Sequence, residues 1–207
     1  MSEENELSVK VVLLGESGVG KTCIIGRFID DTFDKNIKST TGADYTGKTM
    51  TFPEYGGKRI KFEIWDTAGQ EIYRALTKIF YKDAKIAILV YDITKRETYE
   101  EMKEYWYYQV REAADQDVII AIAANKCDMY EEEKVTEGEG REFAKKIGAF
   151  YQLTSAFTNI GIEDLFKTIG KQYLDFYISN KNKNKAEKKI NLPETNLQEK
   201  KIKKGCC

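Results

Sequence analysis

The sequence predicts an α/β fold in which helices flank a mostly parallel central sheet that contains one antiparallel strand. Short apolar segments typical of buried strands alternate along the chain with segments of helical periodicity. This alternation favours parallel strands joined by crossover helices. Segments 45–52 and 59–65 instead alternate apolar and polar residues on either side of Gly56-Gly57, which predicts an antiparallel hairpin.

The elements can be placed in chain order from the same patterns. Residues 9–14 form a short apolar strand that runs into Gly15, and residues 21–30 have the pattern of a helix. Segment 31–42 is polar and irregular, which predicts a loop before the hairpin. The remaining predicted elements are strands at 86–91, 117–124 and 150–153 and helices at 96–114, 136–147 and 162–178.

Length and composition predict one domain at residues 1–179 and a flexible tail at 180–207. The tail is polar and of low complexity, with nine lysines against three glutamates, a net charge of +6. The remaining residues carry 24 basic and 31 acidic side chains, a net charge of −7. The basic tail therefore suggests contact with an anionic surface, whereas the overall charge of −1 gives no general attraction to nucleic acid.

Cysteine usage and the chain start indicate a cytosolic protein with reduced thiols. The four cysteines have no spacing typical of a zinc site, and the absence of histidine excludes a mixed site. Residues 1–6 are polar and acidic, so no signal peptide is expected. No apolar run reaches 18 residues, so no membrane span is expected.

Residues 15–22, Gly-Glu-Ser-Gly-Val-Gly-Lys-Thr, match the phosphate-binding pattern G-x-x-x-x-G-K-[ST]. The glycines allow the backbone to aim its N–H groups at phosphate oxygens, and the following helix presents its positive N-terminus to them. Lys21 is expected to reach the β- and γ-phosphates, and the Thr22 hydroxyl to bind magnesium. The alternative is a glycine-rich turn with an incidental Lys-Thr pair, which the preceding strand and following helix disfavour.

Two further segments at predicted strand ends point to a guanine base. In Asn125-Lys126-Cys127-Asp128, the Asp128 carboxylate can accept hydrogen bonds from N1–H and the 2-amino group of guanine, which adenine does not offer in that arrangement. Lys126 can lie along the base, and Asn125 can tie this loop to the phosphate loop. Segment 154–156, Thr-Ser-Ala, would hold the base from the other side through a backbone N–H. Alone, the first segment could equally be a polar loop after a strand.

A third group of residues suggests a switch that senses the γ-phosphate. Asp66 would hold magnesium through water, the Gly69 N–H could bond the γ-phosphate, and Gln70 could orient the attacking water. Thr40 lies in the predicted early loop and could offer its hydroxyl to magnesium. Alternatively, Gln70 is a solvated residue at a helix start and Thr40 an ordinary loop threonine. Loss of the γ-phosphate would release both the loop that carries Thr40 and the segment that carries Gly69 and Gln70.

With these motifs the chain resembles the small GTPases of the Ras superfamily, and within it the Rab branch, over about residues 8–178 and the last two residues. Branch marks are the sequences at 61–65 and 89–94 and the Cys206-Cys207 end. The resemblance implies a P-loop NTPase G domain that binds Mg²⁺ and GTP or GDP and hydrolyses GTP slowly, with Gln70 positioning water. It implies metal contacts from Thr22, Thr40 and Asp66. It implies nucleotide contacts from Ser17, Gly18, Val19, Gly20, Lys21, Thr22, Cys23, Phe33, Thr40, Gly69, Asn125, Lys126, Asp128, Ser155, Ala156 and Phe157.

The chain departs from the family pattern at three places. Phe157 stands where the family usually has lysine, and could pack over the base in place of the lysine stem. Thr41 replaces an aliphatic residue and could loosen the packing of its loop. The effector-facing aromatic trio reads Tyr45, Trp65 and Phe80, with the first and last exchanged, which moves a hydroxyl across that face.

The resemblance also implies partners, a location and lipid anchoring. A Rab protein regulates vesicle trafficking and meets an exchange factor, an activating protein, a GDP-dissociation inhibitor or escort protein, and GTP-dependent effectors. Cys206 and Cys207 look like the signal for two geranylgeranyl groups, which would give stable anchoring at the cytoplasmic face of endomembranes. The alternatives are a GTP-binding scaffold with negligible turnover, a metabolic phosphoryl-transfer enzyme, or a Ras- or Rho-type signalling switch.

Overall fold

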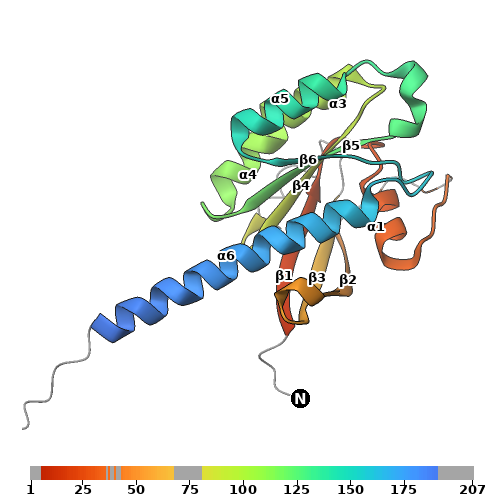
Figure 1. Cartoon of the computed structure of the whole chain (residues 1–207). Coiled ribbons are helices and arrows are strands. Elements are labelled where there is room, and N and C mark those ends of the chain that lie inside the picture. Colours follow the sequence, from red (N-terminus) through yellow and green to blue (C-terminus); the bar gives the residue numbers. More distant parts are fainter. Residues whose placement is uncertain (1–5, 36, 38–39, 41–42, 68–80, 191–207) are drawn as a thin grey trace, which may run out of the picture. The chain divides into compact units, whose positions relative to one another are not determined.

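The computed structural model describes residues 6–35, 37, 40, 43–67 and 81–190 (Figure 1). A six-stranded sheet has the order β2-β3-β1-β4-β5-β6. Its strands are β1 (Glu6–Leu14), β2 (Ala43–Phe52), β3 (Lys58–Thr67), β4 (Ile86–Asp92), β5 (Ile119–Asn125) and β6 (Phe150–Leu153). Among these described strands, β2 pairs antiparallel with β3 and the other pairings are parallel. The predicted fold class is confirmed.

Helices cover both faces of the sheet and bury two apolar layers (Figure 1). On one face, α1 (Lys21–Asp30) and the first part of α6 (Ile162–Ile190) contribute Ile24, Phe28 and Phe166 to the core. On the other, α3 (Arg96–Glu101), α4 (Tyr107–Ala113) and α5 (Glu137–Ile147) bury side chains against β4 and β5. Every residue of β4 is buried, and residues 86–91 form a continuous apolar run before the buried Asp92.

The first strand begins earlier than its apolar pattern indicates. β1 starts at Glu6 rather than Val9, because Glu6 pairs in register with Arg59 of β3 and the two side chains form an ion pair at 3.0 Å. A charged residue at a sheet end carries no apolar signal.

The predicted helix 96–114 is divided by a π-helical turn at Met102–Trp106, between α3 and α4. Met102 and Trp106 of this turn are fully buried. The helix therefore lies where it was predicted. Over these five residues, however, each turn contains more residues than a turn of an α-helix. Such turns are frequent at functional sites.

The expectation that the helical pattern ends near residue 178 is wrong. Helix α6 continues to Ile190, into the segment predicted to be flexible. Residues 171–190 contain no glycine or proline, and their lysines are good helix formers. The sequence lacks apolar residues to bury there, which is why periodicity gave no signal. The chain divides into two compact units, Met1–Leu174 and Asp175–Cys207. The division into a domain at 1–179 and a flexible tail at 180–207 stays a prediction.

Two glycines in helix α5 allow a matched test of core packing. A methyl group on Gly140 would lie 2.4 Å from Cε2 of Tyr151 and 2.7 Å from the hydroxyl of Tyr91, two buried rings. On exposed Gly138, the nearest atom is the Thr136 hydroxyl at 3.9 Å. We expect Gly140→Ala to lower the free energy of unfolding by about 1–3 kcal/mol through overpacking. Gly138→Ala should leave stability equal or raise it by up to ~1 kcal/mol.

Urea unfolding of both variants with saturating GDP measures this difference. Equal stability of Gly140→Ala and the parent chain would contradict the packing described for α5 and β6.

A further property of the fold concerns membranes. Among the residues that the structure describes, no helix has the length and apolar character needed to cross a bilayer.

Candidate functional site

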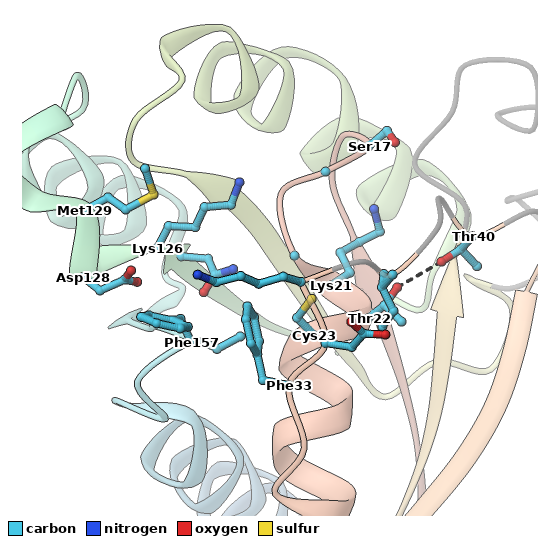
Figure 2. A pocket seen from close by; sticks show the side chains of 17 residues that line it. Ser17, Lys21, Thr22, Cys23, Phe33, Thr40, Lys126, Asp128, Met129 and Phe157 are labelled. Atoms are coloured by element: carbon cyan, nitrogen blue, oxygen red, sulfur yellow. Dashed lines mark hydrogen bonds between the residues drawn. The ribbon is translucent and has the colours of Figure 1, made fainter.

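A cavity of about 500 Å³ opens at the carboxyl ends of the parallel strands, where ligands bind in open α/β sheets (Figure 2). It brings together predicted residues from four separate segments. They are Ser17, Gly18, Gly20, Lys21, Thr22, Cys23, Phe33, Thr40, Asn125, Lys126, Asp128, Ala156 and Phe157. Four lining residues were not predicted: Asp34, Lys35, Ile37 and Met129.

One end of the cavity is formed by the loop between β1 and α1. Gly15 adopts φ +148°, and a methyl group there would lie 2.2 Å from the Val90 carbonyl oxygen. Gly20 has φ +98° and meets the side chain of Asn125, so neither position has room for a side chain. The sequence pattern thus reflects close backbone approach to neighbouring elements. Val19 of this loop is fully buried and faces the core.

Lys21 begins helix α1 and is almost completely buried. Its ammonium donates hydrogen bonds to the carbonyls of Gly15 and Glu16 at 2.8 and 3.0 Å. Burial lowers the pKa of Lys21 to about 8, although the carboxylates of Asp66 and Glu16 act in the opposite direction. A buried cation among backbone groups is suited to an anionic ligand.

The π-helical turn reaches the same loop, a contact that the sequence analysis missed. The Trp106 indole N–H donates to the Glu16 carboxylate at 3.2 Å. The two residues are 90 positions apart in the chain, and only the irregular turn in the helix could have marked this tryptophan as different from ordinary core.

Three oxygen-bearing side chains meet near Lys21, those of Thr22, Thr40 and Asp66, and Figure 2 shows the first two. The Thr22 hydroxyl donates to Oδ2 of Asp66 at 2.6 Å, and the Thr40 hydroxyl donates to the same oxygen at 3.3 Å. The two hydroxyls are 2.9 Å apart. Burial raises the pKa of Asp66, while the Thr22 hydrogen bond and the charge of Lys21 lower it. The other carboxylate oxygen, Oδ1, is buried without a hydrogen-bond partner among the described residues.

The other end of the cavity is formed by the loops after β5 and β6. Asn125 donates to the Val19 carbonyl at 2.8 Å, and so joins this end to the phosphate loop as predicted. Thr154 donates to the Asn125 side chain at 3.2 Å. Ser155 donates to Oδ1 of Asp128 at 2.6 Å, which fixes the carboxylate at the cavity wall.

Lys126 is held by a residue to which the sequence analysis gave no role in the site. Its ammonium lies 2.6 Å from Oδ2 of Asp92, the last residue of β4, which is completely buried. The other Asp92 oxygen accepts from the Thr94 N–H and hydroxyl at 2.9 and 2.7 Å. The ion pair places the lysine stem along the cavity (Figure 2).

Two aromatic rings face Asp128 and Lys126 across the cavity (Figure 2). Phe33 and Phe157 are in edge-to-face contact, with ring centroids 5.4 Å apart. The Lys35 ammonium lies 4.6 Å from the Phe157 ring centroid, a cation–π contact. Phe157 thus packs against an aromatic residue of the loop after α1.

Other predicted residues lie away from the cavity or outside the described part of the chain. Tyr45 and Trp65 pair across β2 and β3, with ring centroids 5.4 Å apart, and Tyr45 is about half exposed. The predicted residues outside the described ranges are Thr41, Gly69, Gln70, Phe80, Cys206 and Cys207.

The fold and the cavity define a class, the nucleotide-binding G domains built on a phosphate loop. Comparison with known proteins identifies the group within it. A model of the Ras family matches residues 10–175. The chain is 43% identical to Ras-related protein Rab-22A of Homo sapiens over 164 residues, which are 79% of this chain and 82% of that protein. It is 42% identical to Ras-related protein Rab-31 of Rattus norvegicus over 164 residues, with the same coverage.

A plant relative is similarly close. Ras-related protein RGP2 of Oryza sativa subsp. japonica is 42% identical over 160 residues, 77% of this chain and 72% of that protein. The chain belongs to the Ras family, as a Rab-type small GTPase. It binds GTP and GDP, hydrolyses GTP, and regulates vesicle trafficking.

Proposed function

We propose that the cavity binds Mg²⁺ with the guanine nucleotide, phosphates at the Lys21 end and base at the Asp128 end. The observation that carries this proposal is the Asn125–Val19 hydrogen bond, which joins the base loop and the phosphate loop into one continuous site. Lys21 neutralises the β- and γ-phosphates, while Ser17, Gly18, Gly20 and Cys23 line the phosphate end. Val19 and Gly69 contribute through their backbone.

The base end reads guanine by its hydrogen-bonding edge. Asp128 accepts from N1–H and the 2-amino group, and the hydrogen bond from Ser155 orients it for this. The Ala156 N–H donates to an acceptor on the opposite side of that edge. The Lys126 stem, held by Asp92, covers one side of the base, and Phe33 and Phe157 pack on the other.

The residues around Asp66 fit magnesium. Hydroxyl and carboxylate oxygens are the ligands that Mg²⁺ prefers, and the buried Asp66 Oδ1 has no hydrogen-bond partner among the described residues. Thr22 and Thr40 would hold the ion directly, and Asp66 through water. When bound, Mg²⁺ neutralises charge on the β- and γ-phosphates.

Hydrolysis and switching depend on groups near the γ-phosphate. Gln70 positions the attacking water, and an activating protein accelerates the reaction. Thr40 senses the γ-phosphate through its loop, so hydrolysis changes the surface that effectors meet. Tyr45, Trp65 and Phe80 form that effector surface, and a GDP-dissociation inhibitor and an exchange factor complete the cycle.

The tail anchors the protein to the cytoplasmic face of endomembranes. Two geranylgeranyl groups on Cys206 and Cys207 give stable anchoring where one chain gives marginal binding. The nine lysines of residues 180–207 add attraction to anionic lipids.

The test is the release of fluorescent GDP from the full chain, competed by unlabelled GDP, GTP or ATP, with and without EDTA. We expect GDP and GTP to compete and ATP not to, and release to accelerate once EDTA removes Mg²⁺. Equal competition by ATP would contradict the role of Asp128. Release indifferent to EDTA would contradict the roles of Thr22 and Asp66. GTP turnover that stays negligible when an activating protein is added would favour the alternative of a GTP-binding scaffold.

A further inference from the structure

Arg27 lies on helix α1, outside the cavity, and contacts the loop that forms the base end of the site. Its Nε donates to the Ala156 carbonyl at 2.7 Å, and its Nη2 donates to the Phe157 carbonyl at 3.0 Å. These residues follow Arg27 by 129 and 130 positions. One guanidinium therefore fixes two consecutive peptide units of the base loop.

The same guanidinium also contacts the segment that leads out of α1. Its Nη1 donates to the carbonyl of Asp31 at 2.8 Å and to the Asp31 carboxylate at 3.1 Å. Its central carbon lies 5.7 Å from the ring centroid of Phe33, a cation–π contact. Arg27 thus holds both segments that carry an aromatic wall of the cavity, Phe33 on one and Phe157 on the other.

The identity of residue 157 makes this contact important. Phenylalanine has no polar side-chain group, so residue 157 itself is held through its backbone carbonyl. A trans peptide points its carbonyl and its N–H in opposite directions. Because the Ala156 carbonyl points toward Arg27, the N–H of the same peptide unit, which belongs to Phe157, points away from Arg27. The planar guanidinium bonds the two loop carbonyls and Asp31 at the same time, and the smaller donor set of a lysine ammonium does not match this fixed geometry.

We propose that Arg27 is a positioning residue for the base pocket: it holds the loop 154–158 and Phe33 at the separation that the guanine base requires, and so sets how slowly the nucleotide leaves. The inference rests on the proposed function of the cavity. Arg27 touches neither base nor phosphate, and acts through the Ala156 and Phe157 carbonyls and the Phe33 ring.

The experiment measures the release of fluorescent GDP at fixed Mg²⁺ from full-length Arg27→Met, Arg27→Lys and the parent chain. Arg27→Met loses the two charge-assisted hydrogen bonds to the base loop and the two to Asp31, and GDP release should accelerate by about tenfold or more. Arg27→Lys retains the positive charge and part of the hydrogen bonding. Its rate of GDP release should therefore lie between the rates of Arg27→Met and the parent chain. If Arg27→Met does not fold, Arg27→Lys alone decides the question.

Two control variants separate this role from general effects of charge. Arg141→Met removes an exposed arginine that also has an ion pair, to Glu137 at 2.6 Å, and a cation–π contact, with Tyr151 at 5.0 Å. Lys103→Met removes a second cation away from the cavity, with an ion pair to Glu100 at 2.7 Å and a cation–π contact with Tyr99 at 4.7 Å. Both should release GDP at close to the parent rate.

Amide hydrogen exchange of the GDP-bound protein distinguishes local opening of the base loop from a general loss of stability. Ser155 and Ile160 donate backbone hydrogen bonds to each other's carbonyls at 2.9 and 3.1 Å, so opening of the loop is visible there. We expect faster exchange at 154–160 in Arg27→Met, and unchanged exchange in β5.

Three results would overturn the proposal: an unchanged release rate in Arg27→Met, a parent-like rate in Arg27→Lys, or exchange that rises equally across α1 and the sheet. Failure of the parent chain to prefer GDP over ATP would instead overturn the proposed function of the cavity, so the two failures are distinguishable.

Discussion

Asp128→Asn is expected to change the base that the protein binds. The substitution removes the acceptor for N1–H and the 2-amino group of guanine, so GDP affinity should fall by a factor on the order of 10⁴, because such sites strongly reject unmatched analogues. Xanthine carries a carbonyl in place of the 2-amino group, to which the introduced amide can donate. Xanthosine diphosphate should therefore bind the variant better than GDP does. Ser155 can still donate to the side-chain oxygen at this position.

Competition of fluorescent GDP and xanthosine diphosphate measures the exchange of specificity. Glu131→Gln is the matched control, since it removes an exposed carboxylate from the same 3-10 helix (Cys127–Glu132) without touching the cavity. A variant that loses GDP without gaining xanthosine diphosphate would leave Asp128 a structural role only.

Lys21→Met is expected to abolish most of the contribution of the phosphates to binding. Removing one partner of a buried charge pair costs about 3–5 kcal/mol, so GDP affinity should fall more than about a hundredfold. Guanosine, which has no phosphate, should bind the variant and the parent chain equally. The lost ammonium also leaves the Gly15 and Glu16 carbonyls without its hydrogen bonds, so near-UV circular dichroism should accompany the titrations.

Lys85→Met is the control for loss of a lysine, because its ammonium pairs with Asp115 at 2.5 Å and does not line the cavity. Isothermal titration with GDP and competition with guanosine complete the comparison. Guanosine binding that weakens as much as GDP binding would show that Lys21 acts on the fold of the loop rather than on phosphate.

The sequence predicted the sheet and its one antiparallel strand well, because apolar strands and the glycine pair leave local signals. It missed the start of β1 at Glu6, where pairing with β3 rather than apolar character extends the strand. It also placed the end of α6 too early, because residues 179–190 are helical by propensity without an apolar face.

The candidate site was predictable where its chemistry has a local pattern. The segments around Lys21 and Asp128 follow such patterns, and the structure places both at one cavity. The contacts of Asp92 and Arg27 were not predicted, because their partners are 34 and about 130 residues away. Asp92 lies in the branch sequence at 89–94, but that pattern does not indicate its partner. Contacts between distant segments depend on the folded arrangement of the helices and strands.

The π-helical turn has a consequence for spectroscopy. The chain contains two tryptophans, and this turn brings one of them, Trp106, into hydrogen-bonding contact with Glu16 of the phosphate loop. The other, Trp65, is in edge-to-face contact with Tyr45 and has the Lys10 ammonium 5.1 Å from its ring centroid. Indole emission responds to nearby charge and polarity, so the unlabelled protein carries one natural fluorophore beside the phosphate loop and another beside Tyr45. Replacing either indole with phenylalanine would assign each optical signal to its own segment.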